Sequence, residues 1–62
     1  MPVVTVLQGP RPVEKKEELV HSLTQAFVDV LGLSAETVQV WITEVPPDSW
    51  SHGGTLMSKK NT

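Results

Sequence analysis

A length of 62 residues without a single cysteine is the feature that most restricts how this chain folds. A chain of this size buries only about 60% of the surface that its unfolded form exposes, so a lone domain is marginally stable. Small domains usually compensate with disulfides, a structural metal or further subunits. Disulfides are excluded here, and His21 and His52 are the only imidazoles. We therefore predict one domain over residues 1–62 that is stabilised by oligomerisation.

The first half of the chain predicts a strand followed by one long helix. The β-branched run Val3–Leu7 favours a strand, and Gln8-Gly9-Pro10 ends it. Pro12 stands where a helix begins, with Glu14 in the first turn, and Gly32 is well suited to end that helix. Apolar side chains between these ends recur at helical spacing. They predict one buried helical face made by Val13, Leu19, Val20, Leu23, Ala26, Phe27, Val30 and Leu31.

A second strand is predicted over Val38–Thr43, where side chains alternate with a period of two. Strand, long helix and strand form a crossover that makes the two strands parallel and lays the helix over one face of the sheet. The opposite face, which carries Trp41, needs another cover. Because open sheet edges and two-stranded sheets invite pairing with another chain, subunits are expected to assemble through their sheets.

The end of the chain predicts a loop and a turn. Residues Val45–Thr55 are rich in Pro, Ser and Gly, with the turn expected at Gly53-Gly54. The tail beyond it is expected to form a short strand or a hairpin against a neighbouring subunit. The predicted fold class is therefore α+β: a β-α-β subunit with two parallel strands, one long helix and a C-terminal turn or hairpin.

Charge and composition exclude several kinds of partner. A net charge of −2 and a pI near 5.5 argue against a nucleic-acid surface, which needs a concentrated basic patch. No apolar stretch approaches the ~20 residues that span a bilayer, so we expect no membrane partner and a cytoplasmic protein. Glu44, Asp48 and His52 have a generic spacing, and we expect no metal site from them.

Pro2 is the best-placed base in the chain. Methionine aminopeptidases remove an initiator Met before a small residue, so the mature chain is expected to begin with a free prolyl amine. An ordinary chain amine titrates near ~7.7–8.0, and nearby cations together with burial lower that value toward neutrality, where general-base catalysis works best. Met-Pro alone is also the start of many ordinary N-termini, so the rest of the chain decides.

Four features together resemble 4-oxalocrotonate tautomerase and its family over essentially the whole chain. They are Met-Pro before a strand, Gly-Pro-Arg before a long helix, Ile42-Thr43-Glu44, and the turn Trp50-Ser51-His52-Gly53-Gly54. The resemblance implies a β-α-β subunit that dimerises through its sheets, with three dimers closing into a homohexamer whose active sites are shared between subunits. It also implies an isomerase without a cofactor. The type reaction converts a dienol such as 2-hydroxymuconate into its conjugated ketone during bacterial breakdown of aromatic compounds.

The resemblance assigns roles to three residues. Pro2 takes the enol proton and returns it to carbon, and Arg11 binds a carboxylate of the substrate through two parallel hydrogen bonds. A cation is disfavoured at a helix N-terminus by the macrodipole, which favours a functional role for Arg11 over that of a solvated charge. Trp50 occupies the place of an aromatic residue, usually phenylalanine, and it either walls the pocket or anchors an oligomer interface.

Two residues depart from the family pattern. Gln39 stands where the type enzyme has a second arginine that polarises the substrate carbonyl. Replacing that ionic contact by a neutral one is expected to cost on the order of 1–3 kcal/mol, or about one to two decades in rate on the type substrate. His52 stands where relatives more often carry an aliphatic residue at the mouth of the pocket. It is either an exposed turn histidine or a donor that partly replaces the missing arginine.

Two alternatives stay open at this level. The same proline serves relatives that hydrate or dehalogenate their substrates, and these usually pair it with an acidic residue that activates water. Glu44 is the nearby candidate in sequence. A non-catalytic oligomeric binding module, in which Gln39 marks a lost active site, is the alternative from another class.

Overall fold

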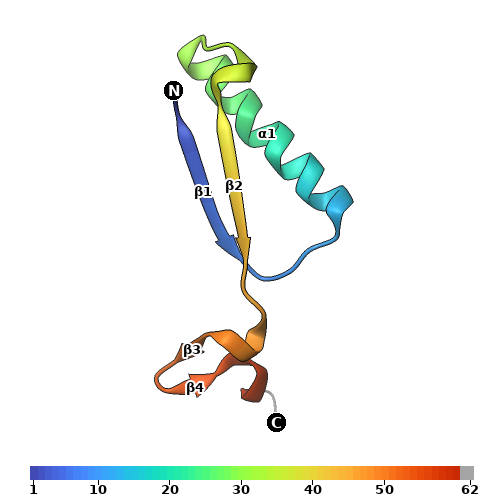
Figure 1. Cartoon of the computed structure of the whole chain (residues 1–62), viewed down its shortest axis with the longest axis vertical. Helices are drawn as coiled ribbons and strands as arrows, with labels where there is room; N and C mark the ends of the chain where they lie inside the picture. Colours follow the sequence, from blue (N-terminus) through green and yellow to red (C-terminus); the bar gives the residue numbers. More distant parts are fainter. Residues whose placement is uncertain (61–62) are drawn as a thin grey trace.

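The structure, a computed structural model, describes residues 1–60. Strand β1 (Val3–Gln8) leads into helix α1 (Val13–Leu31), and a 3-10 turn η1 (Ala35–Thr37) leads into strand β2 (Gln39–Glu44). A second 3-10 turn, η2 (Pro47–Ser49), precedes the short strands β3 (Ser51–His52) and β4 (Thr55–Leu56) and the final 3-10 turn η3 (Met57–Lys59). Figure 1 shows α1 running beside the β1-β2 sheet, with β3 and β4 beyond the far ends of those strands.

The β-α-β subunit is confirmed. Strands β1 and β2 pair in parallel, with Val3 opposite Gln39, Thr5 opposite Trp41 and Leu7 opposite Thr43. Alternation along each strand half-buries one set of side chains: Val4, Val6, Val40 and Ile42. Because the crossover returns the chain over one side of the sheet, α1 covers one face, and the half-burial of these β-branched side chains assigns them to that face. Described residues include no helix long and apolar enough to cross a membrane.

Helix α1 begins after Pro12 and ends before Gly32, as the sequence predicts. Pro12 is the N-cap residue, with Glu14 in the first turn. Gly32 adopts the left-handed conformation at φ 68°, and its N–H donates to the carbonyl of Val28 at 3.0 Å. A left-handed residue after the last turn satisfies a free carbonyl, and glycine takes that conformation without a Cβ clash.

The predicted apolar face of α1 is wrong at its ends. The half-buried apolar residues are Leu19, Val20, Leu23, Phe27 and Val28. Val13, Val30 and Leu31 are 60%, 80% and 59% exposed, and Ala26 is exposed as well. The reason is geometric, since a helix of 19 residues extends past a sheet whose strands have six residues each. Side chains at the helix ends therefore find no strand beneath them.

One face of the sheet has no cover within the chain. Its side chains come from alternate positions of both strands, and Val3, Leu7 and Trp41 are 57%, 75% and 63% exposed. No described residue is fully buried. The radius of gyration is 15.3 Å, whereas a compact chain of this length has about 10–11 Å. A single copy therefore has no closed hydrophobic core.

The C-terminal segment forms the predicted hairpin. Strands β3 and β4 pair antiparallel, and Gly53 and Gly54 connect them with φ of 58° and 87°. Two successive positive φ angles suit the right-handed twist of a two-residue hairpin, and glycine accepts them readily. Within the chain, the Met57 N–H donates to the Trp50 carbonyl at 3.0 Å, and packing of this tail against a neighbouring subunit stays a prediction.

Candidate active site

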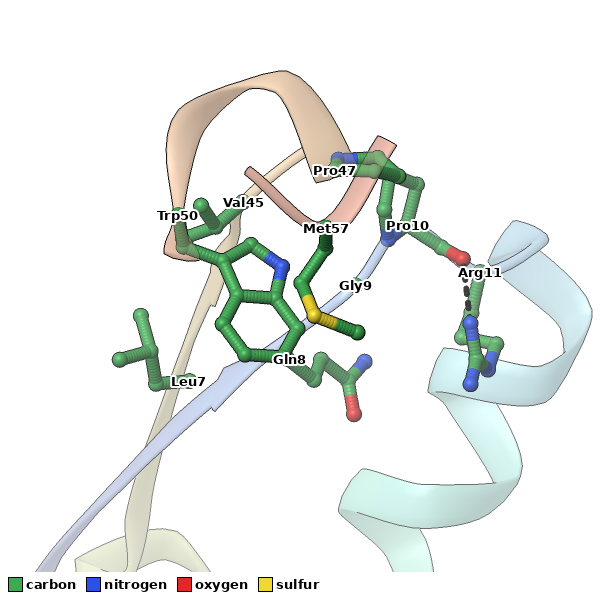
Figure 2. A pocket seen from close by; sticks show the side chains of 9 residues that line it. All are labelled: Leu7, Gln8, Gly9, Pro10, Arg11, Val45, Pro47, Trp50 and Met57. Carbon is green, nitrogen blue, oxygen red and sulfur yellow. Dashed lines mark hydrogen bonds between the residues drawn. The ribbon is translucent and has the colours of Figure 1, made fainter. Parts of the chain in front are cut away.

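A cavity of about 580 Å³ lies where β1 ends, between the β1-α1 connection and the C-terminal segment. Figure 2 shows Trp50 and Met57 of the C-terminal segment near Leu7 and Gln8 of β1, with Arg11 at the start of the helix. This volume falls in the range typical of small-molecule sites. The cavity is lined by Leu7, Gln8, Gly9, Pro10, Arg11, Val45, Pro47, Trp50 and Met57.

Glu44 anchors the connection that carries Arg11. The carboxylate oxygen Oε2 of Glu44 accepts the backbone N–H of Arg11 at 3.0 Å and lies 3.1 Å from the Lys16 ammonium. These contacts, the Arg11 N–H first and the Lys16 hydrogen bond next, hold the pKa of the Glu44 carboxyl below its usual range. Glu44 is thus an ionised support outside the cavity lining, which leaves it poorly suited to activate water.

The Arg11 guanidinium retains most of its donors. Its Nη1 atom donates to the Pro10 carbonyl at 2.8 Å, which orients the planar group. Within residues 1–60, Arg11 takes part in no ion pair. A guanidinium has five N–H donors in a fixed fork that matches a carboxylate. Arg11 therefore offers a guanidinium without a direct ion-pair partner, among the described residues, at the edge of an apolar cavity.

Trp50 is the largest wall of the cavity. Its backbone carbonyl accepts the Met57 N–H already described, and the Trp50 residue is 40% exposed. His52 packs edge-to-face on the indole, with ring centroids 5.2 Å apart and an interplanar angle of 79°. His52 does not itself line the cavity. The structure thus puts Trp50 on the wall beside Arg11 and puts the exposed His52 behind it.

Pro2 and Gln39 lie together at the other end of the sheet. The Gln39 backbone N–H donates to the Pro2 carbonyl at 3.0 Å, and the Trp41 indole Nε1–H donates to Gln39 Oε1 at 3.1 Å. Pro2 lies five residues before Leu7, the first residue of the cavity lining, which is about 17 Å along the strand at ~3.3 Å per residue. With Met1 attached, the Pro2 nitrogen is an amide and has no lone pair for proton abstraction.

The five predicted site residues therefore form two groups within one chain: Arg11, Trp50 and His52 at one end, and Pro2 and Gln39 at the other. Sequence reasoning missed Met57 and Pro47 as cavity walls and Glu44 as the anchor of Arg11. The signal for Glu44 was present, since the end of a parallel strand lies beside the end of its neighbour: Glu44 is opposite Gln8, where the connection to Arg11 begins. In the described part of the chain, no three His, Asp or Glu side chains gather as a metal site.

Comparison with known proteins connects this geometry to one family. The sequence profile described as Tautomerase enzyme matches residues 2–60. A probable tautomerase of Ralstonia nicotianae is 47% identical over 55 residues, which cover 89% of this chain and 77% of that protein. The 2-hydroxymuconate tautomerase of Comamonas testosteroni is 33% identical over 51 residues, which cover 82% of this chain and 79% of that enzyme.

Solved structures agree in fold. The crystal structure of a 4-oxalocrotonate tautomerase homologue superposes with a TM-score of 0.87 at 44% identity, covering 97% of both chains. A heterohexameric 4-oxalocrotonate tautomerase from Chloroflexus aurantiacus superposes with a TM-score of 0.77 at 28% identity, again over 97% of each chain. The fold is thus shared over 97% of this chain in both cases. This chain belongs to the tautomerase family of isomerases, in the group of 4-oxalocrotonate tautomerase.

Proposed function

We propose that this protein moves a proton between the enol and ketone forms of a small unsaturated 2-hydroxy acid, such as 2-hydroxymuconate, with Pro2 as the general base. The observation that carries the proposal is the free Arg11 charge at the rim of an apolar cavity, in a chain whose relatives include a 2-hydroxymuconate tautomerase. An enolic acid has both parts that such a cavity accepts, a carboxylate and an unsaturated body. Met1 is removed in the active form, so that Pro2 has a free secondary amine.

The proton balance needs no cofactor. The Pro2 nitrogen takes the proton from the hydroxyl oxygen at carbon 2, and the electron pair of that O–H bond forms the carbonyl. The double bonds shift along the chain, and the far carbon receives the same proton from the prolyl ammonium. One group therefore acts first as base and then as acid, which is most effective when its pKa lies near the working pH.

Arg11 stabilises the charge that this step creates. Its guanidinium binds a carboxylate of the substrate and lies close to the dienolate, whose negative charge grows as the proton leaves. A bound substrate displaces water from the apolar walls beside it, and a hydrogen bond to a charged group is stronger where water is displaced. Because the Arg11 backbone is held by Glu44, the guanidinium starts from an anchored connection.

The reaction requires two copies of the chain. Pro2 and Arg11 lie at opposite ends of β1, so no single copy brings the base to the charge. The outer edge of β1 is unpaired in the two-stranded sheet. Two copies that place these edges side by side in opposite directions bring Pro2 of one copy next to Arg11 of the other.

We further propose a homohexamer built from three such dimers. The supporting observations are the exposed sheet face around Trp41, the absence of any fully buried residue in the described part of the chain, and the long extent of 47 Å. Burial of that face in an assembly supplies the core that one copy lacks. A relative of the same fold is a heterohexamer.

Kinetics with a defined N-terminus test the proposal. Ketonisation of 2-hydroxymuconate is followed by ultraviolet absorbance for protein that mass spectrometry shows to begin at Pro2. Pro2→Ala is expected to lower kcat at least tenfold, because proton transfer by a positioned group typically contributes about 10²–10⁴-fold. A matched control retains Met1 by an N-terminal extension, which converts the amine to an amide, and it is expected to be inactive. Full activity of the extended chain would refute a role for the prolyl amine.

The same experiment separates the alternatives. A binding module shows no turnover in any form of the chain. A hydratase or dehalogenase instead releases a hydrated product or halide from a halogenated acrylate in a reaction that also depends on Pro2.

A further inference from the structure

The cavity contains one charge. Arg11 is the single ionised residue in its lining, the Gln8 amide is the one neutral polar side chain, and most of the remaining walls are apolar. An indole, a thioether and the aliphatic Leu7 and Val45 make up those walls. A cavity of this composition binds one carboxylate and an apolar body, because a second carboxylate would lose its water without gaining a cation.

The remaining cations of the chain do not supply a second carboxylate site. The chain has five Lys and Arg residues. Lys15 and Lys16 lie in a smaller hollow on the helix side of Arg11, and they already pair with Glu18 at 3.4 Å and Glu44 at 3.1 Å. Lys59 and Lys60 follow the hairpin and do not line the cavity.

A second copy adds no charge either. The strands β1 and β2 contain neither Lys nor Arg. A second copy that brings its Pro2 to the cavity also brings Gln39, whose N–H donates to the Pro2 carbonyl, and Trp41, whose indole donates to Gln39. Both of these side chains are neutral, so the complete site of a homo-oligomer still has Arg11 as its cation.

Trp41 determines how Gln39 presents its amide. The indole Nε1–H is only a donor, so the Gln39 atom that it contacts at 3.1 Å is the carbonyl oxygen Oε1. The Nε2 amide hydrogens are left as the free end of the side chain. A neutral N–H donor suits an enol or ketone oxygen, whereas a carboxylate is better matched by a cation.

We infer that the preferred substrate is a 2-hydroxy-2-enoic acid with one carboxylate and an apolar, planar substituent. Its carboxylate binds Arg11, its 2-oxygen faces the Gln39 amide beside Pro2, and its substituent lies against Trp50 and Met57. The inference rests on the proposed tautomerase function and narrows it. It sets this chain apart from an enzyme built for a dicarboxylic dienol.

Three substrates test the inference in protein that begins at Pro2. They are 2-hydroxymuconate, 2-hydroxypenta-2,4-dienoate, which is the same dienol without its far carboxylate, and the enol of phenylpyruvate, which has an aromatic substituent. The expected kcat/KM is at least tenfold higher for each monocarboxylate than for 2-hydroxymuconate. The three kcat/KM values are compared at one ionic strength, because Arg11 contacts a carboxylate of each substrate and salt weakens that contact.

Two variants separate charge from shape. Met57→Lys puts an ammonium where the substituent lies and is expected to raise kcat/KM for 2-hydroxymuconate about tenfold relative to that for 2-hydroxypenta-2,4-dienoate. Trp50→Leu removes the aromatic wall and is expected to raise KM at least fivefold for the enol of phenylpyruvate, with a smaller change for the pentadienoate. Sedimentation velocity of both variants verifies that the assembly is unchanged.

The possible outcomes are distinguishable. A higher kcat/KM for 2-hydroxymuconate than for both monocarboxylates would overturn the inference, while turnover that depends on Pro2 would still support the tautomerase. Absence of turnover with all three substrates would overturn the proposed function and the inference with it. The expected order, inverted or levelled by Met57→Lys, would establish a monocarboxylate specificity.

Discussion

Replacement of Arg11 tests how much of the reaction depends on one guanidinium. Arg11→Gln removes the charge but retains the backbone N–H that donates to Glu44 at 3.0 Å, so the connection between β1 and α1 remains anchored. The side chain is exposed and forms no ion pair within residues 1–60, and its one internal bond, to the Pro10 carbonyl, spans adjacent residues. The substitution therefore changes the site with little effect on the fold.

The expected loss follows from the contact that disappears. A hydrogen bond to a charged group contributes about 1.5–3 kcal/mol, and each 1.36 kcal/mol corresponds to a factor of ten. Arg11→Gln is therefore expected to lower kcat/KM about 10- to 150-fold. Arg11→Lys is the matched control, since it retains the charge but loses the planar fork of the guanidinium. Its kcat/KM is expected to lie between those of the original protein and Arg11→Gln.

The assay is steady-state ketonisation of an enolic acid, together with thermal unfolding by circular dichroism. We expect a large change in kcat/KM and a melting temperature close to that of the original protein. A kcat/KM within threefold of the original would refute the assignment of Arg11 to substrate binding. An equal loss of melting temperature would instead identify Arg11 as a structural residue.

Three further predictions concern stability and assembly. The folded protein lowers the pKa of Glu44, so its carboxylate stabilises the fold above the unfolded pKa near 4.5, and this stabilisation is lost as pH falls through the lower folded pKa. The difference in melting temperature between the original protein and Glu44→Gln should therefore shrink from pH 6 to pH 3, and a constant difference would contradict this. Gly54→Ala forces a Cβ into φ 87° and should reduce the unfolding free energy by about 1–2 kcal/mol in urea titrations, whereas Gly9→Ala, whose Cβ meets Arg11 Nη1 at 3.7 Å, should be tolerated. Thr5→Lys puts an ammonium opposite Trp41 on the uncovered sheet face, which should weaken the assembly and reduce the sedimentation coefficient. His21→Lys on the exposed helix surface should leave the sedimentation coefficient unchanged, and an intact assembly with Thr5→Lys would argue against burial of that face.

Local signals predicted the secondary structure well where their physical cause is local. Val3–Leu7 and Val38–Thr43 predicted both strands to within one residue at each end, since β-branched alternation suits a pleated, half-buried surface. Pro12 and Gly32 bounded the helix because their backbone preferences act on a single turn. The apolar pattern of the helix was less informative, since burial of Val13, Val30 and Leu31 depends on how far the sheet extends beneath them.

The candidate site was predicted as a set of residues and not as an arrangement. The family resemblance identified Pro2, Arg11, Gln39, Trp50 and His52 together, but it left open which of them meet in one chain. In the structure, Arg11 and Trp50 line the same cavity, whereas Pro2 and Gln39 lie at the opposite end of the sheet. Met57 had no signal of its own, because its contact with Trp50 arises from a hairpin that reverses the chain.

The sequence by itself thus determined the order and type of the elements, the parallel crossover and the family, because periodicity, turn residues and chain length act locally or through general rules of chain connection. Only the tertiary structure decided that Glu44 supports Arg11, that Trp41 orients the Gln39 amide, and that Pro2 and Arg11 lie a strand apart. The physical reason is that these facts depend on register and on distances between residues remote in sequence. A composition or a spacing does not specify either quantity.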